Sequence, residues 1–440
     1  MNEEIISRFL ISVELKNESR EVLLINGLYG FIDVIDENTS ALIKKWNRTG
    51  IRKEEDIELY DKLKKRKYIT SKESEEIQFE RLVKILDGKR KKAINNFLSA
   101  TFILSYRCNF KCPYCFEKDI DRNSPIMSKE QVNAVLDLYP NHSPQKICFY
   151  GGEPFLPEHR EIIYYIIEKN PSSEFLALTN GYYLEEYTEL FKGKKVRQIQ
   201  VTLDGDKEEH NRTRILKNGG GSFDKILRGI EKCIDYRIPI KIRMNITYDN
   251  INSCLALKKK LTDKYGSTNL LSFDMQELFQ YQGKMKRELT ERLLMESNNG
   301  KRNIILDNMP RVARFFYNGQ PIAPTIIGCE SSIANRFYDP YGRIYTCFTS
   351  VGHPERAVGT YAPYYELKEK SILKRSAYEI EACRKCSCIF LCGGGCSNAL
   401  YDENDGDIYK PNCATMKDIL EHVIPFLYCR GKENESISCN

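Results

Sequence analysis

The chain has 440 residues, of which 41% are hydrophobic and 29% charged, a balance typical of a globular protein long enough for several domains. Its acidic N-terminal stretch, MNEEIISRFL, is unlike a signal peptide, and its apolar runs fall short of the roughly 18–20 residues that span a membrane. The net charge of +6 is mild and the short basic runs carry no nucleic-acid-binding motif, so we expect a cytoplasmic protein with no nucleic acid and no membrane as partner.

Residues 1–95 are expected to form a small separate unit in which strands precede helices. β-Branched and apolar residues alternate over 8–15 and 21–35, with a polar turn between them, and this pattern predicts strands. The expected helices cover 39–47, 54–69 and 71–88. Thr39 and Ser71 stand where N-caps would begin the first and last helix. This order of elements favours a winged-helix-like module.

From 96 to 280 the pattern changes to strands that alternate with helices. The expected strands are 101–105, 146–150, 174–179, 197–203, 240–247 and 270–276, and the helices between them include 128–139, 159–170 and 223–236. In the last helix Cys233 recurs with Ile226 and Ile230 at helical spacing, so we expect it in the core. The alternation predicts an α/β fold with a parallel sheet curled into a partial (β/α)6 barrel of the TIM type. Chemistry in such folds lies at the carboxyl ends of the strands.

The rest of the chain is expected to form a bridge and a further domain. Residues 281–325 carry helical patterns at 287–298 and 304–318 and read as a helical bridge. Residues 326–440 are rich in Cys, Gly and Tyr and poor in long periodic runs until a last helix expected at 416–427. A region so short of apolar core needs another source of stability, and metal clusters are one.

Cysteine is unusually abundant, with 16 in the chain. A disulfide framework is disfavoured because the cytosol keeps thiols reduced, so redox chemistry or metal binding is the better default. None precedes position 108, three cluster at 108–115, and ten lie between 329 and 439.

The first cluster lies in YRCNFKCPYCFE (106–117), directly after the first expected barrel strand. A structural zinc site takes four ligands, so Cys108, Cys112 and Cys115 leave one coordination position free. Their Cys-x3-Cys-x2-Cys spacing, with Tyr114 as the aromatic before the last thiol, resembles the radical S-adenosylmethionine (radical SAM) enzymes. The resemblance implies that these catalytic thiols hold a 4Fe–4S cluster whose open iron chelates S-adenosylmethionine. The motif alone leaves a zinc or copper site, or free thiols, as alternatives.

Polar motifs end several of the later strands. The YGGEP motif (150–154) ends the second barrel strand, and the resemblance assigns Gly151, Gly152 and Glu153 to the amino group of the methionine moiety. Three later predicted strands also end in polar motifs, namely LTNG, VTLDG and RMN. By the same resemblance the candidate cofactor contacts there are Thr179, Asp204, Arg243 and Asn245, and Tyr114 joins them.

The segment from 203 to 226 resembles one typical of the branch that modifies peptides and proteins. Its polar residues His210, Arg212 and Arg214 are expected on a loop after the fourth barrel strand. We interpret them as residues that order the loop or face the substrate.

The C-terminal cysteines resemble the seven-cysteine pattern of the SPASM domain, which holds two auxiliary 4Fe–4S clusters. The matching positions are Cys329, Cys347, Cys383, Cys386, Cys392, Cys396 and Cys413. The resemblance implies one cluster on Cys383, Cys386, Cys392 and Cys413, and a second, inner cluster on Cys329, Cys347 and Cys396. Seven thiols suit four-coordinate zinc poorly.

A ligand count leaves the inner auxiliary cluster one short. Three 4Fe–4S clusters contain twelve irons, one of which binds the cosubstrate, and the motifs supply ten of the eleven remaining ligands. The inner cluster therefore has an open iron or takes a ligand such as Cys388 or Cys148. Cys429 and Cys439 are expected to be bystanders.

The first 95 residues also resemble the precursor-recognition module of ribosomal-peptide maturases, in which a leader peptide adds as a strand to an exposed sheet edge. A stabilising cap is the alternative.

Together the resemblances imply a radical enzyme that modifies a ribosomally made precursor peptide and takes electrons from a flavodoxin- or ferredoxin-type reductant. An open iron beside the substrate favours intramolecular thioether formation. Carbon–carbon crosslinking, formylglycine formation as in sulfatase maturation, and a non-catalytic iron–sulfur electron carrier are the alternatives.

Overall fold

The computed structural model describes residues 3–15, 17–278, 322–329, 335–369, 371–403 and 407–429, together with the isolated positions 288, 289, 291–293, 315 and 333. The chain divides into two compact units made of interleaved segments. The first unit contains residues 1–95, 308–330 and 374–440, and the second contains 96–307 and 331–373. None of the helices in the described ranges is both long enough and apolar enough to cross a membrane.

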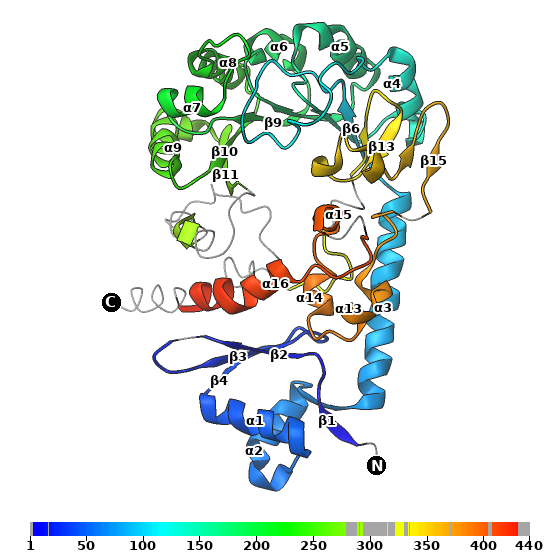
Figure 1. Cartoon of the computed structure of the whole chain (residues 1–440), viewed down its shortest axis with the longest axis vertical. Coiled ribbons are helices and arrows are strands. Elements are labelled where there is room, and N and C mark those ends of the chain that lie inside the picture. Colours follow the sequence, from blue (N-terminus) through cyan, green and yellow to red (C-terminus); the bar gives the residue numbers. More distant parts are fainter. Residues whose placement is uncertain are drawn as a thin grey trace. The chain divides into compact units, whose positions relative to one another are not determined.

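Six parallel strands form the centre of the second unit. They are β6 (Ser99–Ile103), β7 (Lys146–Tyr150), β8 (Glu174–Thr179), β9 (Val196–Thr202), β10 (Ile240–Ile246) and β11 (Leu271–Glu277), and they pair in sequence order. Helices α4 (Lys129–Leu136), α5 (Arg160–Lys169), α6 (Leu184–Phe191), α8 (Phe223–Asp235) and α9 (Ile251–Tyr265) lie along the outer side of this sheet (Figure 1). The α/β fold and the mostly parallel sheet, consistent with a partial TIM barrel, are confirmed.

The strands and helices of this unit bury the faces that their sequence patterns indicate. On α5 the isoleucines at 162, 163, 166 and 167 recur at helical spacing and are all buried. On α8 Ile226, Ile230 and Cys233 are fully buried, which confirms Cys233 as a core residue. On β8 and β9 buried residues alternate with partly exposed ones, so these strands bury one face of the sheet.

Four short strands extend the sheet beyond β6. They are β12 (Phe337–Tyr338), β13 (Arg343–Tyr345), β14 (Gly359–Thr360) and β15 (Glu366–Leu367). β12 pairs in parallel with β6 and so satisfies backbone groups at an otherwise open edge. The Tyr106 hydroxyl, which follows β6, donates to buried Asp339 at 2.9 Å. The segment 326–440 is therefore not one compact unit, because 331–373 completes the barrel sheet.

The first unit contains a three-stranded antiparallel sheet and three helices. The sheet order is β2 (Leu10–Glu14), β3 (Val22–Asn26) and β4 (Ile32–Ile35), while β1 (Glu4–Ile6) pairs with β5 (Ile69–Ser71). The helices are α1 (Glu37–Thr49), α2 (Ile57–Lys65) and α3 (Lys72–Asn95). The strand expected over 21–35 is thus two strands, because the Asn26 side chain accepts from the N–H groups of Leu28 and Tyr29 and turns the chain.

Of the two N-cap residues predicted for the N-terminal helices, one is wrong and the other is confirmed. Thr39 was the wrong N-cap, because α1 begins earlier and its cap is Asp36, which accepts from the Thr39 N–H at 2.9 Å. Ser71 is confirmed at the start of α3, where its hydroxyl accepts from the Ser74 N–H at 3.2 Å.

The N-terminal and C-terminal segments of the first unit share a core. The rings of Phe9 and Phe79 lie 5.5 Å apart, and both contact Phe390 at 5.8 and 5.6 Å. Residues 1–95 are therefore packed against the C-terminal segment rather than forming a separate unit. That segment contains α13 (Glu381–Arg384), α14 (Ile389–Cys392), α15 (Leu400–Glu403) and α16 (Ala414–Asp418), and α16 continues through the expected last helix. The bridge helices expected at 287–298 and 304–318 lie outside the described residues, apart from isolated positions.

Alanine substitutions at two glycines test how closely helix α8 packs against α6. Gly229 lies at that contact, and Gly88 of α3 is the control. A Cβ at Gly229 of α8 would lie 2.9 Å from Leu184 Cβ and 3.0 Å from Glu185 N on α6, whereas a Cβ at Gly88 of α3 would meet nothing within 4 Å. We expect Gly229→Ala to destabilise α8 by about 1–3 kcal/mol. Gly88→Ala should stabilise α3 by about 0.5–1 kcal/mol, because alanine favours helix.

Amide hydrogen exchange of the two helices measures both effects in the same protein. Unchanged or slower exchange in α8 of the Gly229→Ala variant would contradict the close packing of α6 on α8.

Candidate active site at the carboxyl ends of the strands

The loop that follows β6 carries three free thiols. Cys108, Cys112 and Cys115 are each partly exposed and none forms a disulfide. The segment 215–217 holds this loop through two backbone hydrogen bonds, from the Lys111 N–H at 2.8 Å and to the carbonyl of Asn109 at 2.9 Å. The structure thus places the three predicted thiols on one short, anchored loop at the end of a barrel strand.

Several N–H groups already point at the sulfur atoms. The Phe110 N–H donates to Cys108 Sγ at 3.4 Å, and Arg122 Nη2 donates to Cys115 Sγ at 3.5 Å. Such donors stabilise a charged thiolate, the form that binds iron. In the metal-free chain, burial raises the pKa of Cys108 to about 12 and also raises the pKa of Cys112. Metal binding would therefore displace protons from these thiols.

The donor set fits a 4Fe–4S cluster better than a single ion. Across the described part of the chain, no three His, Cys, Asp or Glu side chains gather around one metal position. A 4Fe–4S cluster does not require such a gathering, because each thiolate binds a different iron. Three unpaired thiols with N–H groups directed at sulfur provide the ligand chemistry that the cluster needs.

The GGEP loop after β7 lies directly against the cysteine loop. Gly151 has φ +106°, and a Cβ there would lie 2.7 Å from the carbonyl oxygen of Ser105. A Cβ at Gly152 would collide with the Arg107 carbonyl. That carbonyl accepts from the Glu153 N–H at 2.8 Å. Only glycine permits this approach of the two backbones.

The Glu153 carboxylate fastens the GGEP loop to the end of β8. It accepts from the Thr179 hydroxyl at 2.5 Å, the Asn180 N–H at 2.6 Å and the Phe155 N–H at 2.9 Å. Burial raises the pKa of Glu153 to about 7, although these hydrogen bonds act to lower it. Glu153 and Thr179 are thus brought together as expected, but their observed contacts are with each other and with backbone. Their contact with a methionine amino group stays a prediction.

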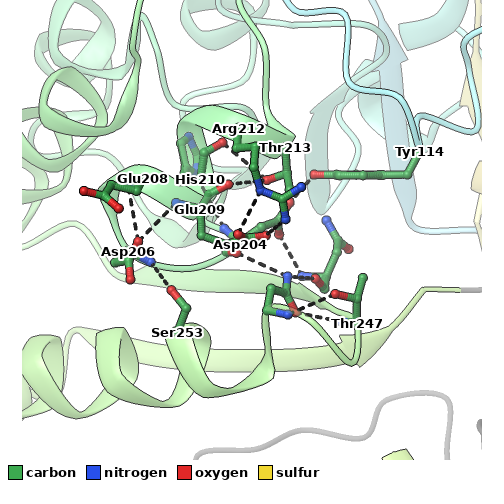
Figure 2. Close-up of polar contacts among 12 residues, drawn as sticks. Tyr114, Asp204, Asp206, Glu208, Glu209, His210, Arg212, Thr213, Thr247 and Ser253 are labelled. Atoms are coloured by element: carbon green, nitrogen blue, oxygen red, sulfur yellow. Dashed lines mark hydrogen bonds and ion pairs between the residues drawn. The ribbon is translucent and has the colours of Figure 1, made fainter.

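Asp204, at the end of β9, joins two other predicted site residues (Figure 2). It is almost fully buried, and one carboxylate oxygen accepts from the Asn245 N–H at 2.8 Å. The other accepts from the Tyr114 hydroxyl. Tyr114 therefore reaches from the cysteine loop to the rim formed by β9 and β10.

Arg214, which the sequence placed among the residues that order a loop or face the substrate, joins Tyr114 and Asp204. Its Nη1 lies 2.9 Å from the Tyr114 hydroxyl oxygen and 3.8 Å from Asp204 Oδ2. Burial acts to lower the pKa of Arg214, but Tyr114, Cys112 and Asp204 outweigh that effect and raise it, so the guanidinium stays charged. Its Nε is buried and has no hydrogen-bond partner among the described residues. A buried N–H donor without a protein partner is uncommon, and this one is available to a ligand or a water molecule.

The segment that carries His210 is a short helix, not the expected loop. Helix α7 (Lys207–Thr213) is capped by Asp206, whose carboxylate accepts from the N–H groups of Glu208 and Glu209, both at 3.1 Å. A short polar run had no apolar periodicity to reveal a helix, and only the cap signalled it.

His210 orders the rim and is shielded from solvent. Burial lowers its pKa well below the ordinary value, so the ring is neutral. Its Nδ1 accepts from the Asp204 N–H at 3.4 Å, so Nε2 donates to Ser222 Oγ at 3.0 Å. This geometry supports the loop-ordering interpretation of His210.

Arg243 and Asn245 lie together on β10, and Arg243, in the middle of that strand, stands opposite Asp274 of β11. The Arg243 guanidinium pairs with Asp274 Oδ2 at 2.8 Å and donates to Asn245 Oδ1 at 3.2 Å. Asp274 is buried, and sequence reasoning missed it because a single carboxylate within a strand gives no motif. The structure thus forms an ion pair between β10 and β11 whose carboxylate is buried and whose guanidinium is partly exposed.

The C-terminal thiols are also partly gathered. In the first unit Cys383 lies close enough to Cys386, Cys392 and Cys413 for their charges to interact. In the same unit the Gly328 backbone lies against Gly395, which sets Cys329 near Cys396. Cys347 belongs to the second unit, where its sulfur lies 3.1 Å from Thr349 Oγ1.

Sequence comparison matches residues 102–256 to the radical SAM superfamily. A GTP 3′,8-cyclase of Clostridium perfringens is 30% identical over 152 residues, which is 33% of this chain and 46% of that protein. The chain thus matches about half the length of that relative. A cysteine-type anaerobic sulfatase-maturating enzyme of Clostridium perfringens is 23% identical over 354 residues, 73% of this chain and 94% of that enzyme.

Two solved structures share the fold. Native anSMEcpe with bound AdoMet and Cp18Cys peptide matches with a TM-score of 0.53 and 22% identity, over 76% of this chain and 99% of that one. Streptococcus suis SuiB bound to precursor peptide SuiA matches with a TM-score of 0.50 and 14% identity, over 93% of this chain and 99% of that one. The family match identifies residues 102–256 as a radical SAM domain, and the two solved structures share the fold.

Proposed function

We propose that this protein is a radical SAM enzyme that modifies a ribosomally made precursor peptide and forms an intramolecular thioether crosslink. The observation that carries the radical step is that three free thiols and the buried Nε of Arg214, which has no hydrogen-bond partner in the part of the chain that the structure describes, lie at one rim of the barrel. The similar structures with bound AdoMet and with bound peptides support the cosubstrate and the class of substrate.

In this proposal Cys108, Cys112 and Cys115 hold a 4Fe–4S cluster. When bound, the cluster and S-adenosylmethionine supply a 5′-deoxyadenosyl radical that abstracts hydrogen from a carbon of the peptide. The glycines of the GGEP loop carry no side chain that would separate their backbone from the methionine amino group. Arg214 offers the carboxylate its Nε–H, which has no partner among the described residues. Tyr114 and Asp204 fix the orientation of the Arg214 guanidinium.

The remaining candidates line the rest of the rim. Thr179 and Glu153 hold the loop that forms the amino-group site, while Arg243 and Asn245 border the rim farther along the sheet. Buried charges with fixed partners can orient a cosubstrate without reorganising when it binds.

The C-terminal thiols are proposed to hold two auxiliary 4Fe–4S clusters of a SPASM domain. Cys383, Cys386, Cys392 and Cys413 form the set for one cluster, and their mutual proximity supports it. Cys329, Cys347 and Cys396 form the set for the other. Because that set is one thiol short of four, it leaves room for a cysteine thiolate of the peptide, which is why a thioether is favoured.

The N-terminal module is proposed to be winged-helix-like and to bind the leader of the precursor. Its β4 is an edge strand of the three-stranded sheet, and among the described residues no strand pairs with its outer side. An extended leader peptide would add there as a further strand. Formylglycine formation is the second candidate, favoured by the similarity to the sulfatase-maturating enzyme over 94% of its length.

The product distinguishes these functions. Anaerobic enzyme, dithionite and S-adenosylmethionine should yield 5′-deoxyadenosine, and a Cys-containing precursor peptide should lose two hydrogen atoms together with one alkylatable thiol. An unmodified peptide thiol together with a new carbon–carbon bond would support carbon–carbon crosslinking instead. An aldehyde in the product would support formylglycine formation instead. Absence of 5′-deoxyadenosine would instead favour an electron carrier.

Alanine at Cys108, Cys112 or Cys115 should abolish 5′-deoxyadenosine formation. We expect each variant to lose about four of roughly twelve irons, because a two-thiol loop no longer holds the cluster. Cys233→Ala is the matched control, since Cys233 is a buried core thiol of α8. Iron analysis and product chromatography measure both effects, and full turnover without one of the three thiols would refute the assignment.

Arg214→Lys should weaken S-adenosylmethionine binding by about tenfold to a hundredfold, because a lysine has no Nε–H and cannot donate in a fixed fork. Arg212→Lys is the control: its side chain is 64% exposed and pairs with Glu209, so binding should be unchanged. Calorimetric titration of the holoprotein measures the affinity. Equal affinity for S-adenosylmethionine in the two variants would show that Arg214 does not contribute to its binding.

A further inference from the structure

A second polar site lies on the cysteine loop, apart from the Tyr114–Asp204–Arg214 cluster. It is a pocket of about 530 Å³ beside Cys108. Its lining includes Arg107, Cys108, Asn109, Arg122, Glu158 and Lys217. Three cations thus face one carboxylate, and the proposed function has used none of these side chains except the Cys108 thiol.

The cations of this pocket differ in how far they are neutralised. Arg107 is 41% exposed and lies 3.9 Å from Glu158, itself 40% exposed, so water and salt screen that pair strongly. Lys217 is exposed, and within the described part of the chain no carboxylate pairs with it. Its backbone N–H donates to the Asn109 carbonyl, which holds Lys217 on the edge of the cysteine loop. The pocket therefore presents uncompensated positive charge to solvent.

Arg122 connects this pocket with the thiols. Its Nη1 lies 3.3 Å from the buried Glu117 carboxylate, and its Nη2 donates to Cys115 Sγ. The pocket thus contacts Cys108 directly, because Cys108 lines it, and is connected to Cys115 through the Arg122 side chain.

We propose that this pocket is the docking surface for the enzyme's electron donor, an acidic one-electron carrier protein of the flavodoxin type. The inference rests on the proposed radical function. One electron leaves the donor's reduced flavin and enters the cluster held by the three thiols; no bond is made or broken, and the donor ends one electron more oxidised. Positive charge around the pocket complements an acidic donor and steers its approach.

The position of the pocket explains why the donor would use it. Electron transfer requires the donor to approach the thiols, and Cys108 itself lines this opening. The peptide and the cosubstrate need the rim where Tyr114, Asp204 and Arg214 meet. A donor bound at Arg107 and Lys217 leaves those residues to the cosubstrate.

The test is binding and electron transfer with an acidic flavodoxin as probe and the reconstituted, iron-loaded enzyme. Lys217→Glu should lower the association rate at low salt by about tenfold and reduce the salt dependence of binding. Arg107→Gln should act in the same direction. Lys260→Glu is the control, because it makes the same charge change at an exposed position of α9.

Chemical reduction separates this inference from the function itself. With dithionite the Lys217→Glu enzyme should form 5′-deoxyadenosine at the rate of the unmodified enzyme, whereas flavodoxin-driven cluster reduction, followed by absorbance and electron paramagnetic resonance, should be slowed. Equal flavodoxin binding and cluster reduction in the Lys217→Glu and Lys260→Glu enzymes would overturn the docking proposal. Loss of precursor-peptide binding instead of flavodoxin binding would overturn it in favour of a peptide surface. Failure of the dithionite reaction in unmodified enzyme would instead refute the radical function.

Discussion

The parallel pairing of six strands is the constraint on which the rest of the site depends. Parallel strands end at the same edge of a sheet, so residues far apart in the chain meet there. Tyr114 and Arg214 are 100 positions apart, yet their side chains form a hydrogen bond at this edge. Without the register that sets β9 beside β10, Asp204 would not receive the Asn245 N–H, and the rim would have no common geometry.

The charged groups at this rim are tolerated because each one has partners. Glu153 gathers three donors, and Arg243 pairs with Asp274. A buried ion without such contacts would cost several kcal/mol, by the desolvation argument for charges in low dielectric. Arg214 also has partners at Nη1, in Tyr114 and Asp204, but its Nε–H has none among the described residues. The protein thus holds a set of fixed dipoles and charges ready before any cosubstrate arrives, and reactive chemistry is left to the cofactors.

The interleaving of the two units bears directly on the cysteine-rich segment. Because β12 completes the edge of β6, the part of the chain that carries Cys347 belongs to the barrel unit. Cys329, Cys396, Cys383 and the three thiols near Cys383 belong to the other unit.

The sequence by itself determined the class of fold, the six barrel strands and the three-thiol loop, because alternating periodicity and close thiol spacing are local properties of the chain. It also located the motifs at the strand ends, including Glu153 and Asp204. It did not reveal the role of Arg214, the ion pair of Asp274 or the position of Asn180, since each depends on a partner distant in sequence. Nor did it reveal that 331–373 joins the barrel sheet, or that Phe9 and Phe79 pack on Phe390. Only the tertiary structure decided these points, because edge pairing and core packing are contacts between segments that no local pattern encodes.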